Sequence, residues 1–206
     1  VGGLVGYNYD GAISNSYSSG TVSGNHYVGG LVGHNKDGGT ITNSYASGTV
    51  SGNHYVGGLV GYNSAGRIDN SYASGLLVGT GYYIGGLVGN NYGTISGSFY
   101  NRDKYTRTGV GGGSPAGVTG KTTAELEDID TFKNAGWSIT ADSTLAKGTP
   151  ILKNGSWVIY VAPTPNPTPN PTPTDNNQKP KVDEQVQRVV ASIEPSTNSN
   201  SNSSSN

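Results

Sequence analysis

A short block of glycine and aliphatic residues recurs along the first half of the chain, and the same order of apolar and polar positions follows each copy. The block reads Gly-Gly-Leu-Val-Gly, and its leucines fall 27, 28 and 28 residues apart. These leucines are Leu4, Leu31, Leu59 and Leu87. Self-similarity at a fixed period of roughly 20 to 50 residues is typical of solenoids and other repeat arrays. We therefore interpret residues 1–100 as a repeat array with one coil per copy.

Two further blocks follow each glycine-rich block. The second block begins with an isoleucine (Ile13, Ile41, Ile68 and Ile95) and ends four residues later with an aromatic residue (Tyr17, Tyr45, Tyr72 and Phe99). The third block reads Gly-Thr-Val-Ser-Gly in the first two copies and Gly-Leu-Leu-Val-Gly in the third. Short β-prone segments bounded by Gly, Asn, Asp and Ser indicate strands and turns. The pattern therefore predicts three short strands per coil.

The period of about 28 residues decides between two all-β repeat architectures. A four-stranded propeller blade needs about 40 residues or more, so the shorter period favours a parallel β-helix. Coils stacked about 4.8 Å apart place equivalent residues of successive repeats in ladders. Because side chains alternate along a strand, we expect the leucines to point inward, and Ile41, Asn43 and Tyr45 to share one face. Asn15, Asn43 and Asn70 are then expected to pair their amides along the stack.

The pattern changes after residue 100. Lys121–Phe132 predicts a short helix with Thr122 or Thr123 as its N-cap, and two strand-like segments follow at 135–139 and 155–160. A solenoid needs an atypical unit to cover its last coil, and this segment is predicted to serve as that cap. The expected organisation is a repeat β-helix at 1–100, an irregular Gly-rich loop at 101–120, a capping segment at 121–162, a Pro-rich linker at 163–180, and a short helix candidate with a disordered Ser/Asn tail at 181–206.

Composition narrows the classes of function. The 206 residues include 34 Gly and only 12% charged residues, with a net charge of −1 and no Cys. High glycine and low charge favour a turn-rich β architecture, and without a basic patch we expect no nucleic-acid partner. Without cysteine, neither disulfides nor Cys-based metal sites form. The longest apolar run is too short to cross a bilayer, so no transmembrane segment is expected. Because the chain begins inside a repeat, we expect it to be a fragment.

Candidate chemistry is sparse. His26 and His54 occupy the same corner of adjacent copies, but two ligands without a third make a poor metal site, and drift between repeats explains them better. Asp10 and Asp37 precede glycines at ordinary turns, and the calcium-binding nonapeptide repeat is absent. The sequence contains no phosphate-binding loop. It also has no Ser, His and Asp in a sequence context that would indicate a catalytic triad. We therefore expect no metal, no cofactor and no enzymatic activity.

One set of residues is a candidate for ligand contact. Tyr27, Tyr55 and Tyr83 precede the glycine-rich block in successive copies and are expected to face solvent. Tyrosine presents an apolar ring with a polar tip, so a row of exposed tyrosines is predicted to stack on sugars. A regular threonine ladder of the kind that binds ice is not supported, because Thr21 and Thr49 are replaced by Leu76 in the third copy.

The repeats resemble a known motif. Gly-Leu-Val-Gly followed by Ile-x-Asn-Ser-Tyr and Gly-x-Val is similar to the GLUG motif of bacterial surface proteins. The later run from Gly117 to Leu126, with Thr131-Phe-Lys-Asn-Ala-Gly-Trp137, resembles the segment that follows GLUG arrays in filamentous-haemagglutinin-like exoproteins. The resemblance extends over about residues 1–160.

The resemblance implies a right-handed β-helical stalk that is exported by two-partner secretion and acts in adhesion. On this reading the chain is the C-terminal part of a large secreted or outer-membrane-associated adhesin. Its expected partners are a host-cell surface, a glycan or a matrix protein, and an outer-membrane secretion partner recognised through a region outside this chain. GLUG repeats also occur in surface peptidases, so the alternative is a non-catalytic repeat region of a surface peptidase or polysaccharide-active enzyme.

Overall fold

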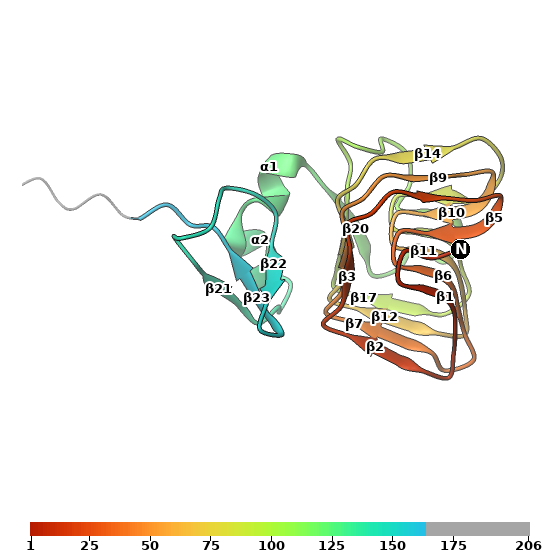
Figure 1. Cartoon of the computed structure of the whole chain (residues 1–206), viewed down its shortest axis with the longest axis horizontal. Helices are drawn as coiled ribbons and strands as arrows, with labels where there is room; N and C mark the ends of the chain where they lie inside the picture. Colours follow the sequence, from red (N-terminus) through yellow and green to blue (C-terminus); the bar gives the residue numbers. More distant parts are fainter. Residues whose placement is uncertain (164–206) are drawn as a thin grey trace, which may run out of the picture. The chain divides into compact units, whose positions relative to one another are not determined.

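The computed structural model describes residues 1–163. Residues 1–121 form a β-solenoid in which each strand pairs in parallel with the equivalent strand of the next coil (Figure 1). In the first four coils register partners lie 27 or 28 residues apart, since Val5 pairs with Val32 and Val32 pairs with Val60. The all-β parallel solenoid predicted from the repeat period is therefore confirmed.

Five parallel sheets run along the solenoid, and each takes one strand from successive coils. The first contains β1 (Val5–Tyr9), β6 (Val32–Lys36), β11 (Val60–Ser64), β16 (Val88–Asn91) and β19 (Val110–Gly113). The second contains β5 (His26–Gly29), β10 (His54–Gly57) and β15 (Ile84–Gly85). The third contains β2 (Ala12–Ser14), β7 (Thr40–Thr42), β12 (Arg67–Asp69) and β17 (Thr94–Ser96).

The remaining two sheets complete the coil. The fourth contains β3 (Tyr17–Ser18), β8 (Tyr45–Ala46), β13 (Tyr72–Ala73), β18 (Ser98–Asn101) and β20 (Val118–Lys121). The fifth contains β4 (Val22–Ser23), β9 (Val50–Gly52) and β14 (Leu77–Gly79). A complete coil such as that of residues 26–52 therefore has five short strands, where the sequence pattern predicted three.

The difference arises because two of the predicted strands are each divided by a bend, one between β5 and β6 and the other between β7 and β8. Asn43 adopts a φ of 48° between β7 and β8, and this left-handed residue turns the chain. As a result Ile41 enters the core of the solenoid, whereas Tyr45 belongs to a separate cluster on its side. The prediction that Ile41, Asn43 and Tyr45 share one face is wrong for this reason.

The core of the solenoid consists of the predicted aliphatic ladders. Leu31, Leu59 and Leu87 are fully buried, and so are Ile41 and Ile68. Ile95 is 8% exposed and belongs to the same cluster. In the first coil, whose outer side none of residues 1–163 covers, Leu4 is 49% exposed and Ile13 is half-buried.

An asparagine ladder is present, but at a different position from the one predicted. The Nδ2 of Asn8 donates to Oδ1 of Asn35 at 2.7 Å, Asn35 donates to Asn63 at 2.9 Å, and Asn63 donates to Asn91 at 2.7 Å. Each of the first three also donates to the carbonyl of the glycine that follows in its turn. Within residues 1–163, no hydrogen bond joins the side chains of the predicted set, Asn15, Asn43 and Asn70.

The coils continue past residue 100. Residues 101–120, expected to be an irregular loop, contain β19 and most of β20, which pair with β16 and β18 as a partial fifth coil. Tyr105, from the preceding loop, packs against two of the solenoid's apolar clusters and donates its hydroxyl to the carbonyl of Ile84 at 2.9 Å.

Residues 121–162 contain two short helices and a small sheet. The predicted helix is divided into α1 (Thr123–Leu126) and α2 (Ile129–Lys133), because Asp128 caps a second start. Thr122 is the N-cap of α1, as predicted, and forms a capping box with Glu125. The strand β23 (Ser156–Ile159) pairs in parallel with β21 (Ile139–Ala141) and antiparallel with β22 (Ile151–Lys153).

This unit packs against the side of the solenoid rather than over its last coil. Tyr17, Tyr45 and Tyr72 form a stacked column with ring centroids 5.1 and 5.2 Å apart. Tyr45, Tyr72 and Phe99 belong to one buried cluster with aromatic and aliphatic residues of 121–162. The aromatic ladder predicted from the second block is thus an interface. The predicted linker beyond Pro163 and the helix candidate and tail at 181–206 lie outside the described residues.

Candidate functional site: an exposed surface of stacked aromatic residues

The three tyrosines predicted to contact a ligand lie together in one column. Tyr27 and Tyr55 are in β5 and β10, and Tyr83 immediately precedes β15. The ring centroids of Tyr27 and Tyr55 are 4.9 Å apart, and those of Tyr55 and Tyr83 are also 4.9 Å apart. Tyr27 is 40% exposed and Tyr83 is 42% exposed. The repeat thus places one tyrosine at this position in three successive coils, with Tyr55 half-buried between its two exposed neighbours.

The backbone at these tyrosines is unusual. Their φ values are 51°, 55° and 59°, in the left-handed region. Asparagine and glycine tolerate that region, but a bulky residue there is an outlier that costs about 1–3 kcal/mol. Asparagine commonly adopts positive φ, which explains this angle at Asn15, Asn43 and Asn70. Tyrosine does not, so the residue type leaves the positive φ of the three tyrosines unexplained. Such strain is a reason to look for a function of the side chain.

A second column lies beside the first. Tyr7, His34 and Tyr62 are register partners in β1, β6 and β11. The ring of His34 lies 5.0 Å from that of Tyr7 and 4.7 Å from that of Tyr62. The two columns are in contact, since Tyr27 stacks on His34 at 5.5 Å.

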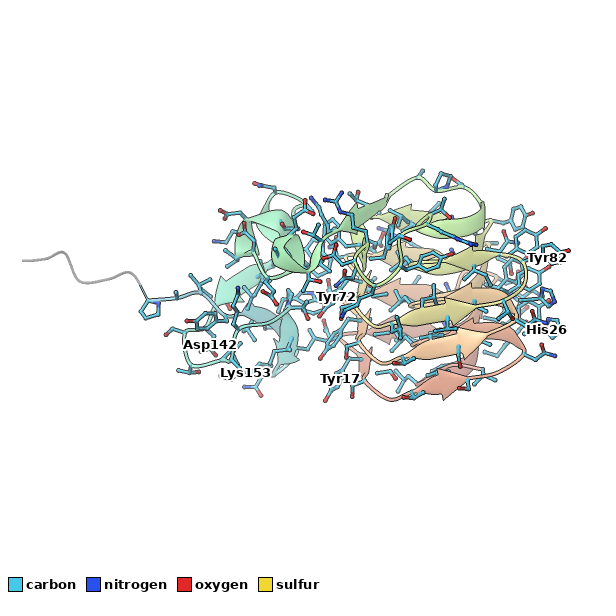
Figure 2. All side chains as sticks on the ribbon, turned by 90° about the horizontal axis from the view of Figure 1, so that it is seen from above. Tyr17, His26, Tyr72, Tyr82, Asp142 and Lys153 are labelled. Carbon is cyan, nitrogen blue, oxygen red and sulfur yellow. The ribbon has the colours of Figure 1, made fainter. Side chains whose placement is uncertain are left out.

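A third column continues the surface on the other side of the tyrosines. The rings of His26 and His54 are stacked at 5.0 Å, and that of Tyr82 stacks on His54 at 5.4 Å. The backbone N–H of Tyr82 donates to Nδ1 of His54 at 3.2 Å, so the neutral ring carries its proton on Nε2. Figure 2 shows His26 and Tyr82 on the side of the solenoid opposite to Tyr17 and Tyr72.

We call this surface the aromatic face. It consists of Tyr7, His26, Tyr27, His34, His54, Tyr55, Tyr62, Tyr82 and Tyr83. The sequence pattern indicated its central column only. The flanking residues escaped notice because the residue type changes from coil to coil: the second column reads Tyr, His, Tyr and then Asn90. The strand register identifies these residues, because it pairs each position of one coil with the equivalent position of the next coil.

The stacking changes how a ligand can contact the aromatic face. Offset rings about 5 Å apart use much of their π-surface on one another, so ring edges, phenol hydroxyls and imidazole nitrogens remain for a ligand. The sequence-based prediction of sugars stacking on ring faces therefore needs modification. The aromatic face offers repeated polar groups on an apolar support, with one set per coil.

The pKa values of three side chains of the aromatic face are shifted toward their neutral forms. Burial lowers the pKa of His34, and the nearby positive charge of Lys36 lowers it further. Desolvation raises the pKa of Tyr55 and Tyr62, and the neighbouring tyrosines add to the effect. Lys36, at the edge of the aromatic face, pairs with Asp37 at 3.3 Å. The surface is therefore suited to a neutral, hydrogen-bonding partner.

Other polar clusters in the solenoid are small. Arg67 and Asp69 form an ion pair on β12, and Ser96 donates to Asp69 at 2.6 Å. Within residues 1–163, no three His, Asp or Glu side chains gather as a metal site would require. None of the helices described for residues 1–163 has the length and apolar character needed to cross a membrane.

Comparison with known families identifies the repeats. The family described as the GLUG motif matches residues 1–23, 24–51 and 52–78. These three repeats are GLUG motifs. The matches stop before the fourth Gly-Gly-Leu-Val-Gly block, whose Ile-Ser-Gly-Ser-Phe sequence departs most from the pattern, although its strands continue the same sheets.

One relative extends the similarity beyond the GLUG motifs. A protein of Evansella cellulosilytica, named as a Gly-rich membrane protein, is 36% identical over 139 residues. The aligned region covers 66% of this chain but spans only 10% of that protein's length. No solved structure matches the chain.

Proposed function

We propose that this chain is part of a surface adhesin and that the aromatic face is its contact surface. GLUG motifs occur in repeat regions of surface and secreted proteins, and together with the membrane-protein relative they support a surface repeat protein. The observation that carries the proposal is the row of Tyr27, Tyr55 and Tyr83. Each is held in a strained backbone conformation, and the rings of Tyr27 and Tyr83 are exposed while Tyr55 is half-buried between them.

The proposed mechanism is multivalent contact rather than catalysis. Each coil repeats similar hydroxyl and imidazole groups at the coil spacing, so an extended neutral partner such as a glycan chain or a matrix protein engages several at once. Linked weak contacts reach an avidity well above that of any single one. Export through an outer-membrane partner, as in filamentous-haemagglutinin-like proteins, remains part of the proposal and concerns regions outside this chain.

The test is binding of the full 206-residue chain to cultured host cells, matrix proteins and a glycan panel. The informative variant combines Tyr27→Asn, Tyr55→Asn and Tyr83→Asn, because asparagine accepts positive φ and removes the ring. We expect saturable binding by the wild type and its loss in the triple variant.

Tyr17→Asn is the matched control, since Tyr17 is also exposed but lies away from the aromatic face. It should leave binding unchanged. Equal binding by the triple variant and the wild type, with both folded by circular dichroism, would contradict the proposal. Binding to isolated polysaccharide but not to cells or matrix proteins would favour the alternative, an accessory region of a polysaccharide-active enzyme.

A further inference from the structure

A polar cleft lies where the solenoid meets the unit formed by residues 121–162, which we call the C-terminal unit, away from the aromatic face. Its volume is about 360 Å³. The solenoid contributes Asn15, Asn43 and Asn70, and the C-terminal unit contributes Gly136, Ser138, Thr140, Gly155, Ser156 and Trp157. Small-molecule sites typically measure about 300–1,000 Å³, so the cleft is large enough for a ligand of one or two rings.

The three asparagine amides of the cleft make no hydrogen bond to the described residues. This contrasts with Asn35 and Asn63, whose amides are buried and fully paired in the other ladder. In the fourth coil Gly97 occupies the equivalent position with a φ of 50°. The backbone therefore accepts glycine here, and the amides of the first three coils are not needed to hold the turn.

The other wall of the cleft is firmly supported. Trp157 is 4% exposed and packs against Tyr45 and Tyr72, with ring centroids 5.7 Å away in each case. Its buried Nε1–H has no acceptor in the described structure, which is unusual for a buried donor. The lining holds no charged side chain.

We propose that this cleft binds a neutral saccharide of one or two sugar units. An amide offers both a donor and an acceptor, and so does each hydroxyl of Ser138 and Ser156, which matches the mixed character of sugar hydroxyls. An edge of the indole supplies apolar surface for the C–H groups of the ring. An anionic ligand would meet no cation here, and a peptide would find no apolar subsite for its side chains.

Tryptophan fluorescence gives a readout that is specific for this site. The chain has two tryptophans, Trp137 and Trp157, and both lie in the C-terminal unit. The aromatic face contains none, so sugar binding there leaves the signal unchanged. The probes are glucose, galactose and N-acetylglucosamine with their disaccharides, titrated into the full chain. We expect a saturable spectral change for at least one of them.

The decisive variant combines Asn15→Gly, Asn43→Gly and Asn70→Gly, because glycine keeps the positive φ and deletes the amides. Affinity should fall about tenfold or more, which corresponds to about 1.4 kcal/mol. A second variant, Ser138→Ala with Ser156→Ala, should weaken binding without touching the solenoid.

The triple tyrosine-to-asparagine variant of the aromatic face is the control and should bind these sugars normally in the fluorescence assay. This separates failure of the cleft from failure of the proposed adhesive surface. The proposal is overturned if no neutral sugar changes the fluorescence, if only anionic sugars or peptides do so, or if the glycine variant binds as tightly as the wild type.

Discussion

The final glycine of the Gly-Gly-Leu-Val-Gly block meets different surroundings in different coils. A Cβ on Gly61 would lie 2.6 Å from the carbonyl oxygen of Gly33 and 2.6 Å from the amide nitrogen of Val28. A Cβ on Gly6, in the first coil, would have no atom within 4 Å. The motif position is therefore constrained by the coil stacked against it, not by its own backbone angles.

This contrast predicts the effect of two identical substitutions. Gly61→Ala should lower the free energy of unfolding by about 3 kcal/mol, since backbone atoms cannot move aside without separating the coils. Gly6→Ala should change it by less than about 0.5 kcal/mol. Urea unfolding followed by circular dichroism measures both. Similar losses in the two variants would show that the glycine is required for another reason.

His34 makes stability depend on pH. Its folded pKa lies below the ordinary value of about 6.5 because burial and Lys36 disfavour the charged ring. Below that ordinary value the unfolded chain therefore binds a proton more readily than the folded chain. The stabilising contribution is complete above about pH 6.5 and decreases as the pH falls.

The measurement is the difference in unfolding free energy between the wild type and His34→Gln from pH 8 to pH 5. Glutamine does not titrate, so the variant should lose less stability than the wild type on acidification, and the difference should shift in its favour below about pH 6.5. A difference that is constant with pH would contradict the assigned direction of the pKa shift.

At the scale of elements, the buried asparagine ladder connects the corners of successive coils. Asn63 donates to Asn91 and to the carbonyl of Gly66, and it accepts from Asn35. Asn63→Ala would remove these three buried hydrogen bonds, each of which contributes about 1 kcal/mol. We expect a total loss of about 3 kcal/mol or more in thermal or urea unfolding.

Asn25→Ala provides the comparison, because Asn25 is exposed and its side chain makes no hydrogen bond to the described residues. Its stability should stay within about 0.5 kcal/mol of the wild type. If Asn63→Ala were equally mild, the ladder would be incidental to the stacking of the coils.

The repeat period predicted the elements that depend only on stacking. The leucine and isoleucine ladders followed from alternation and a step of 27 or 28 residues. The asparagine ladder was misplaced because Asn35 lies beside a Gly-rich turn, whereas Asn43 lies within a strand-like run and then bends it. The cluster around Tyr45 could not be located, since a column of aromatic residues shows the same pattern whether it packs inward or against another unit.

The candidate site was predicted in part for a related reason. Tyr27, Tyr55 and Tyr83 keep their residue type in three copies, so the sequence alone aligned them. Their backbone strain and their contacts with His34 depend on how the coil turns, and no local pattern encodes those. The polar cleft requires two units that are distant in sequence, so its residues share no motif.

At the scale of the whole described region, residues 121–162 and the solenoid are joined through Tyr72. This side chain is fully buried, and its hydroxyl donates to the carbonyl of Pro150. Burial also raises the pKa of its phenol well above the ordinary value. Trp137 makes a second connection by donating Nε1–H to the carbonyl of Gly97 at 2.8 Å. The two units therefore share both apolar packing and directed hydrogen bonds.

Tyr72→Phe tests this connection while keeping the ring and its stacking. The carbonyl of Pro150 loses its donor inside a buried interface, which should cost about 1–3 kcal/mol. Tyr17→Phe in the same column should cost almost nothing, since that hydroxyl belongs to an exposed side chain.

Tryptophan fluorescence reports on the C-terminal unit and circular dichroism mainly on the solenoid, so urea unfolding followed by both probes locates the loss. We expect the fluorescence midpoint of Tyr72→Phe to fall more than the dichroism midpoint, because the unit of 121–162 depends on the contact more than the stacked coils do. A matching shift in both probes would instead show that the two units unfold as one cooperative structure.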